Sequence, residues 1–506
     1  MKITLKSLLM CSSILVMTAG GAMAEMVLNR GNNGDPESLD PHKTSTVTEA
    51  NILRDLFQGL VSQDAKAELI PGAAESWEVS EDGTVYTFKL RAGAVWSDGS
   101  PVVAEDFVFA WQRVVSPDTA AEYAYMLTPI LNAEEITAGT KKPEELGVKA
   151  IDASTFEVTL NATTPYFLEM LTHQATYPVS PANVAAFGAD FTKPGNMVSN
   201  GPYTLAEFTP NDHITLTKSP TFYDAANVAI DTVNFYPTED RSAAIKRFEA
   251  GELDMNDDFP TEQLADMKVK FGDQVKVGPY LGTYYYAFKL DKAPWDNPQL
   301  RQAVSMAIDR DYLAEEVWQN TMIPAYSFVP PGISNFTASA LEYADMSQLD
   351  REDKAKEILT GLGYTPESPL KMEIRFNTSE NHSNTAVAIQ EQLKPLGIEV
   401  SMVNTDGATH YGYLESKGDF DIARAAWIAD YKDPENFLAL CKTGAGNNYG
   451  LYTDATYDGL LAEAAATADP AARMALLSQA EQKGVAEDLC VVPLLFYSSI
   501  RWCRIV

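Results

Sequence analysis

The sequence predicts a mixed α/β fold, because two kinds of hydrophobic spacing occur in one chain. Apolar and polar residues alternate over 86–90 and 156–160, which is typical of strands with one buried face. Segment 372–403 is predicted to run strand, helix over 386–396, Gly397 and strand, which is a βαβ-like unit. The architecture is therefore expected to be neither a β-sandwich nor a helical bundle.

Helix and turn signals support this prediction. Apolar residues recur at helical spacing over 52–60 and again over 300–308, and the second stripe is preceded by Asn297, a good N-cap, and a proline. Asp-Gly pairs at 82–83 and 98–99 predict tight turns. We therefore expect antiparallel strands in the N-terminal third.

The chain is long and strongly acidic. Its 506 residues exceed what one hydrophobic core normally supports, so about two to four domains are expected. Lys and Arg total 38 against 70 Asp and Glu, which gives a formal charge of −32. A negative field of this size repels phosphate backbones and anionic lipids, so it argues against a nucleic-acid-binding or membrane-surface protein.

Residues 1–24 have the three parts of a secretory signal peptide. Lys2 and Lys6 precede a short apolar run over 8–17, and the segment ends in Ala-Met-Ala. We expect cleavage after Ala24 and export to the periplasm. No later run reaches the roughly 18 apolar residues of a membrane-spanning helix, so the mature chain is predicted to be soluble, without direct membrane insertion.

Three cysteines follow the predicted signal peptide. They are Cys441, Cys490 and Cys503. An oxidising compartment permits a disulfide, and Cys441 with Cys490 is the natural pair. Spacing alone does not establish that bond.

The sequence contains no recognisable catalytic or metal-binding motif. None of the five histidines belongs to an H-E-x-x-H motif, and no nucleophile elbow or phosphate-binding loop is present. The glycine-rich segment 444–450 is interpreted as a loop. We predict a binding protein with no metal and no cofactor. A secreted hydrolase that uses two paired carboxylates stays open, because 70 acidic residues make close pairs common.

Several blocks of sequence, spread in order over most of the chain, resemble one known family. They are SLDPHK (38–43), AAESWEVSEDGTVYTFKLRAGAVWSDGSPVVAEDFVFAWQR (73–113), SNGPYTL (199–205), PYLGTYYYA (279–287), AVSMAIDRD (303–311) and ARAAWIADYKDP (423–434). These blocks resemble the extracellular solute-binding proteins of family 5, which serve peptide importers. The resemblance implies a two-lobed, three-domain periplasmic binding protein of the cluster C type, with mixed sheets and a hinge. Such a protein encloses short peptides and delivers them to an inner-membrane ABC permease, normally as a monomer.

The resemblance also implies domain boundaries. Domain I is expected at 25–57 plus 183–281, together with the end of the chain near 498–506. Domain II is expected at 58–182 and domain III at 282–497.

The family's W-x-A-D-Y motif implies a peptide site. It spans 427–431 here, and Asp430 is the family's partner for the ligand's free amine. A carboxylate in a dry cleft binds an ammonium group far more strongly than one on the surface. Without the resemblance, Asp430 would be interpreted as a turn or capping residue.

Further site residues follow from the same resemblance. Backbone groups for the peptide are expected from Ala426 and Ile428 on one side and from Ser45 and Val47 on the other. Trp427 and Tyr123 are expected to line side-chain pockets, or else to be core aromatics. Arg424 and His382 are expected to hold the ligand's carboxylate, with an ordinary ion pair as the alternative for Arg424.

The chain departs from the family pattern in places. Gly282 and Ile428 replace a cysteine pair, and Ala408 stands near an expected indole. The tail over 498–506 matches nothing in the family, so a returning C-terminal strand is predicted to be missing, with an exposed sheet edge and lower stability. A dipeptide or murein-peptide receptor, and a chaperone-like role, remain alternatives to an oligopeptide receptor.

Overall fold

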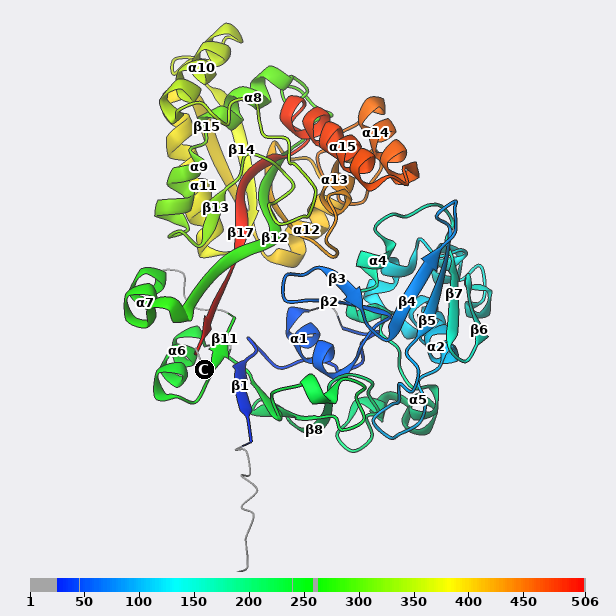
Figure 1. Cartoon of the computed structure of the whole chain (residues 1–506). Helices are drawn as coiled ribbons and strands as arrows, with labels where there is room; N and C mark the ends of the chain where they lie inside the picture. The colour runs from blue at the N-terminus through cyan, green and yellow to red at the C-terminus, as the bar shows by residue number, and fades with distance from the viewer. Residues whose placement is uncertain (1–24, 45, 239, 258–262, 505–506) are drawn as a thin grey trace, which may run out of the picture.

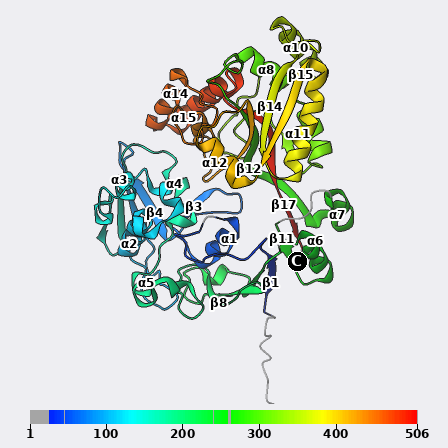
Figure 2. The same ribbon diagram turned by 180° about the vertical axis from the view of Figure 1, so that it is seen from behind.

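The computed structural model shows two lobes joined by long strands (Figures 1 and 2). It describes residues 25–44, 46–238, 240–257 and 263–504. The predicted signal peptide, residues 1–24, lies outside the described residues.

An 11-stranded sheet extends through both lobes. Its order is β15-β14-β16-β12-β17-β11-β1-β10-β9-β8, and β13 pairs with β17. Its lower strands are β1 (Val27–Gly31), β8 (Tyr203–Thr209), β9 (His213–Lys218), β10 (Thr232–Tyr236) and β11 (Met255–Asn256). Its upper strands are β12 (Val275–Phe288), β13 (Met322–Pro324), β14 (Leu370–Asn377), β15 (Ile398–Thr405), β16 (Ile422–Ile428) and β17 (Val492–Cys503). Strands β12 and β17 pair antiparallel from one lobe to the other, so together they connect the lobes.

The lower lobe also contains a four-stranded antiparallel sheet in the order β4-β5-β7-β6. The strands outside the large sheet are β2 (Val61–Gln63), β3 (Leu69–Pro71), β4 (Ala74–Val79), β5 (Val85–Leu90), β6 (Val148–Asp152) and β7 (Thr155–Thr159). The helices are α1 (Val47–Leu56), α2 (Ala104–Val115), α3 (Ala133–Thr137), α4 (Phe167–Met170), α5 (Pro181–Phe187), α6 (Arg241–Ala250) and α7 (Leu264–Phe271). The predicted turn at 82–83 joins β4 to β5, and the predicted strands over 86–90 and 156–160 are confirmed.

The upper lobe confirms the predicted βαβ unit, since β14 and β15 pair in parallel and α11 connects them. Its helices are α8 (Pro298–Ala307), α9 (Arg310–Tyr312), α10 (Gln348–Gly361), α11 (Glu380–Leu393), α12 (Gly407–Glu415), α13 (Glu435–Leu438), α14 (Ala455–Ala466) and α15 (Pro470–Glu481). The predicted cap of α8 is also confirmed, because the Asn297 side chain accepts a hydrogen bond from Gln299 N at 3.0 Å.

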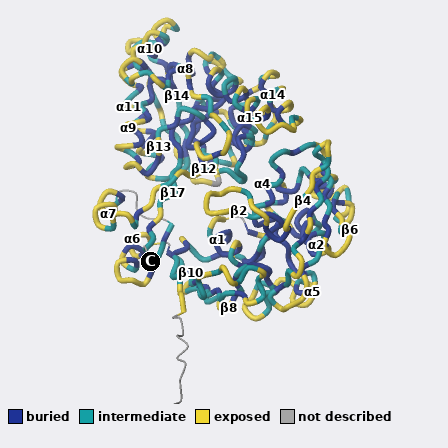
Figure 3. Tube along the Cα trace, viewed as in Figure 1, coloured by how far each residue is buried: buried dark blue, intermediate teal, exposed yellow. Residues whose placement is uncertain are grey.

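Each lobe has its own hydrophobic core (Figure 3). The upper core contains residues from Tyr284 to Leu495, and the lower core contains residues from Leu39 to Phe235. A third, small cluster surrounds Phe248 and Trp502. The lower core includes residues from both predicted domain I and predicted domain II, and the exact domain boundaries stay a prediction.

The prediction that the returning C-terminal strand is missing was wrong. Strand β17 extends to Cys503 and pairs with β12 and with β11, where Trp502 faces Asn256. The Trp502 ring is fully buried, and its centroid lies 5.0 Å from that of Phe248. The tail lacks family motifs, but Ile500 and Trp502 keep the alternation of a strand, and this spacing is enough to complete the sheet.

Three other features bear on the sequence predictions. Cys441 and Cys490 form a disulfide, and Cys503 is a free thiol. Over the described ranges, no helix is both long and apolar enough to cross a membrane. Within the same described ranges, no three or more His, Cys, Asp or Glu side chains lie close enough together to hold a metal ion.

Candidate functional site

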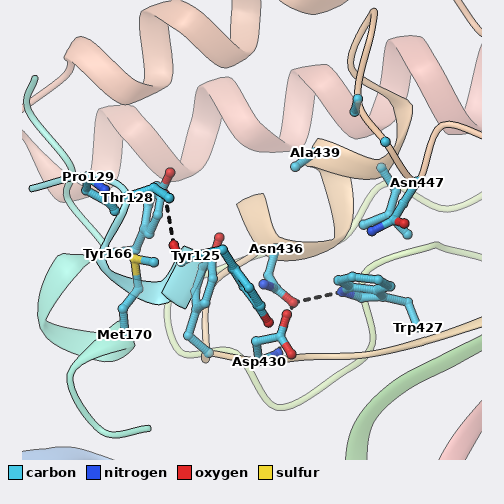
Figure 4. A pocket seen from close by; sticks show the side chains of 14 residues that line it. Tyr125, Thr128, Pro129, Tyr166, Met170, Trp427, Asp430, Asn436, Ala439 and Asn447 are labelled. Carbon is cyan, nitrogen blue, oxygen red and sulfur yellow. Dashed lines mark hydrogen bonds between the residues drawn. The ribbon is translucent and has the colours of Figure 1, made fainter. Parts of the chain in front are cut away.

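A cavity of about 390 Å³ lies between the lobes (Figure 4). The residues that define its character are Tyr125, Tyr166 and Met170 from the lower lobe and Trp427, Asp430 and Asn436 from the upper lobe. Among the described residues that line the cavity, Asp430 is the only charged one. The cavity therefore combines one acid with a mainly aromatic and apolar wall, which is typical of a small-ligand site.

Asp430 follows the end of β16 and projects into this cavity. Burial raises the pKa of its carboxyl, whereas hydrogen bonds with Tyr125 and Asn436 act to lower it. Within the described part of the chain, no Lys, Arg or His forms an ion pair with this carboxylate. The cavity therefore contains an acid without a counter-ion, in a position to bind a cationic group.

Trp427 and Asp430 are held by one amide side chain. The Trp427 indole N–H donates to Asn436 Oδ1 at 2.8 Å, and the Asp430 backbone N–H donates to the same oxygen at 3.2 Å. Trp427 is half-buried and lines the cavity, so the structure brings it to Asp430 as the resemblance implies. Sequence reasoning missed Asn436, Tyr125 and Tyr166, because they meet Asp430 through folding and belong to no motif with it.

Among the described strands, none pairs with the side of β16 that faces away from β12 beyond Ala423, and this free edge leads toward the cavity. Strand β12 covers one side of β16 along its length, whereas β14 pairs with the other side only as far as Ala423. The Ala429 N–H donates to Leu281 O of β12 at 2.8 Å. Because backbone groups alternate along a strand, those of Ala426 and Ile428 point away from β12, toward the free edge. An extended ligand could pair with this edge as an added strand.

Arg424 lies nearer the start of β16 and is buried, and none of the described acidic residues forms an ion pair with it. Its guanidinium donates to Asn377 Oδ1 at 3.0 Å, to the Tyr411 hydroxyl at 2.8 Å and to the Tyr497 hydroxyl at 3.1 Å. It also lies over the Tyr284 ring, with 4.7 Å between its central carbon and the ring centroid. Among the described residues no carboxylate neutralises this charge, so the sequence-based alternative of an ordinary ion pair is not seen there.

His382 belongs to the same buried cluster. Its Nδ1 lies 3.4 Å from the Tyr284 hydroxyl, and the residue is almost completely buried on α11. Burial, together with the nearby charge of Arg424, lowers the pKa of His382 to about 3. The imidazole is therefore neutral at pH 7, and it offers a hydrogen bond but no charge.

The remaining candidate residues are less closely grouped. Tyr123 is half-buried and stacks on His173, with ring centroids 4.4 Å apart. Burial, together with the nearby charge of Asp430, raises the pKa of the Tyr123 hydroxyl. Val47 is 55 % exposed at the start of α1, so its backbone lies in a helical turn and not in an extended segment. Ser45 lies outside the described residues.

Polar and aromatic contacts also join the lobes beside the cavity. Lys432 Nζ of the upper lobe lies 2.9 Å from Glu68 Oε1 of the lower lobe and 3.1 Å from the Ala67 carbonyl oxygen. The rings of Tyr166 and Tyr431 stack across the gap, nearly parallel, with centroids 5.1 Å apart. These contacts hold the two walls of the cavity in register.

Comparison with known proteins identifies the family. Residues 68–449 match the family described as bacterial extracellular solute-binding proteins, family 5 Middle. The chain belongs to this family. It is also 39 % identical to the periplasmic oligopeptide-binding protein OppA of Escherichia coli (strain K12) over 490 residues, 96 % of this chain and 89 % of that protein.

Solved structures support the same assignment. The unliganded open form of MppA, a periplasmic murein tripeptide-binding protein, gives a TM-score of 0.87 at 37 % identity, covering 95 % of this chain and 93 % of that one. OppA of Haemophilus influenzae in complex with the peptide RPPGFSPFR gives 0.75 at 35 % identity, covering 95 % of both chains. The two-lobed α/β architecture expected from the resemblance is thus confirmed.

Proposed function

We propose that this chain is the periplasmic substrate-binding component of an ABC-type oligopeptide importer. It encloses short peptides between its lobes and delivers them to an inner-membrane permease. The observation that carries this proposal is Asp430, an acid in an aromatic cavity between two lobes that has no counter-ion among the described residues. The family assignment and the peptides named for its relatives support the same conclusion.

In the proposed binding mode, the protein contacts the groups that all peptides share, which are the free amine, the backbone and the carboxylate. The ligand's ammonium group pairs with Asp430, and its backbone pairs with the free edge of β16 at Ala426 and Ile428. Arg424 receives the ligand's carboxylate, and His382 adds a neutral hydrogen bond. Trp427 and Tyr123 contact ligand side chains.

The strand geometry sets an upper limit on the peptide length that can use both charged groups. Asp430 and Arg424 are six positions apart in sequence, and a strand rises about 3.3 Å per residue, so their backbones are separated by at most about 20 Å. The reach of the Arg424 side chain shortens this span. Peptides of up to about six residues therefore fit between the two groups.

The proposed protein is a monomeric receptor and not an enzyme. One cavity per chain is sufficient for delivery. In this proposal Asp430 and Arg424 bind the charged ends of the peptide and catalyse no reaction.

Calorimetric titration of the mature protein with di- to hexapeptides tests this function. A murein-type tripeptide and a set of non-peptide amines serve as comparison ligands, and mass spectrometry of each mixture detects cleavage. The proposal predicts saturable binding of free peptides with no turnover. Cleavage would indicate a hydrolase, and binding of amines without any preference for peptides would reject the proposal.

A further inference from the structure

The side chain of Asn436 has a fixed orientation beside Asp430. Only 5 % of the residue is exposed, and its Oδ1 accepts hydrogen bonds from both Trp427 Nε1 and the Asp430 backbone N–H. Two donors on one atom identify that atom as oxygen. The amide N–H groups are therefore the donors that remain beside the Asp430 carboxyl, and the Asn436 side chain acts to lower the pKa of that carboxyl against the larger effect of burial.

The short helix that carries Asn436 is fixed by several contacts. It belongs to α13, which is preceded by Asp433, and the Asp433 carboxylate forms two hydrogen bonds of 2.7 Å with Arg473 in a buried ion pair. The hydroxyl of Tyr457 donates to the carbonyl of Leu438 at the end of the same helix, at 2.5 Å. These contacts all belong to the upper lobe. Asn436 is therefore held by contacts within its own lobe.

We infer that Asn436 is a positioning residue, whose single amide directs the Asp430 carboxylate and the Trp427 ring toward the ligand's amino-terminal end. This inference rests on the proposed function. The amide contributes in two ways. Its oxygen fixes the indole and the backbone at Asp430, and its N–H groups stabilise the ionised carboxylate against the burial that opposes ionisation.

A purely structural role for Asn436 makes different predictions. It would affect the temperature of unfolding but not the preference for a free amine, nor the pH at which binding is lost. Asn436→Asp separates the two roles, since it is isosteric and keeps an acceptor oxygen for Trp427. It removes the donor to Asp430 and puts a like charge beside it, which raises the pKa of a carboxyl in such a pair.

The test compares wild type, Asn436→Asp, Asn436→Leu and the control Asn404→Asp, which is exposed on β15 of the same lobe. Each is titrated with one tripeptide and its N-acetylated form from pH 4.5 to 8, and each is melted. We expect Asn436→Asp to bind the free peptide at least about tenfold more weakly at neutral pH. Its loss of binding on acidification should begin at a higher pH, and its preference for the free amine should shrink, whereas Asn404→Asp should match wild type.

The inference is overturned if wild type prefers the free amine and Asn436→Asp keeps the same preference and the same pH profile. Asn436→Leu removes the acceptor of the Trp427 indole N–H. If this variant fails to fold, the comparison of Asn436→Asp with wild type tests the inference. A wild type that binds acetylated and free peptide equally well would instead reject the proposed function, and the positioning role with it.

Discussion

Tyr125 and Asp430 come from opposite lobes and both line the cavity, where their side chains lie beside each other (Figure 4). Tyr125 is still 43 % exposed, so this contact lies at an accessible edge of the site. Burial raises the pKa of the Asp430 carboxyl, and the Tyr125 phenol acts against this shift. The lower lobe thus helps keep the proposed amine-binding acid ionised.

Tyr125→Phe should weaken binding of a free peptide by roughly 1 kcal/mol at neutral pH, because one hydrogen bond to a charged group is lost. Binding needs ionised Asp430, so affinity falls as the pH drops through the pKa of that carboxyl. Removing the phenol raises this pKa, and the decline should therefore begin at a higher pH than in wild type. Titrations across pH check this, with Tyr223→Phe, an exposed lower-lobe tyrosine, as control. Identical pH profiles would contradict the role of Tyr125.

Amidating the C-terminal carboxylate of the ligand should weaken binding by about 2 kcal/mol or more, since buried Arg424 would then lack a counter-ion in the complex. Changing the ligand avoids the risk that an Arg424 variant fails to fold. Competition between amidated and free-acid forms of one peptide measures the effect. Equal affinities would mean that Arg424 serves only its contacts with Tyr411 and Tyr497.

Trp502→Ala should destabilise the small cluster around Phe248 by about 3–5 kcal/mol, because a fully buried ring leaves a cavity. Urea unfolding measures the loss. Arg501→Ala is the matched control, since that neighbouring side chain is 55 % exposed. If both variants unfold like wild type, the end of β17 does not pack as described.

Breaking the Cys441–Cys490 disulfide should lower the unfolding free energy by about 2–4 kcal/mol, because the bond closes a long loop and restricts the unfolded chain. The comparison is thermal unfolding of Cys441→Ser/Cys490→Ser in a Cys503→Ser background. The background variant alone should match wild type. An unchanged midpoint in the triple variant would show that the bond adds no stability.

Local patterns made most of the fold predictable. The βαβ unit of β14, α11 and β15 shows its two periodicities within one continuous segment, and Asp82-Gly83 specifies its turn by itself. The end of β17 contains no family motif, and its only sequence signal is the alternation of Ile500 and Trp502. A buried strand needs that alternation and no particular motif.

The site was predictable only where a motif supplied it. Asp430 and Trp427 share one motif and do line one cavity. Tyr125 and Asn436 reach them through packing of the lobes and through a short helix beyond a turn, and a single sequence does not encode such contacts as a spacing. The sequence also does not predict that His382 is neutral, because this state follows from its burial beside Arg424.

The most direct measurement of the central claim is a cycle of four titrations, in which wild type and Asp430→Asn each bind one tripeptide with and without an N-acetyl group. If Asp430 pairs with the ligand's ammonium, acetylation should weaken binding to wild type by about 2–5 kcal/mol. In Asp430→Asn the same acetylation should change affinity by less than about 0.5 kcal/mol, since the two changes remove one shared interaction. An acetylation penalty of equal size in both proteins would contradict the account.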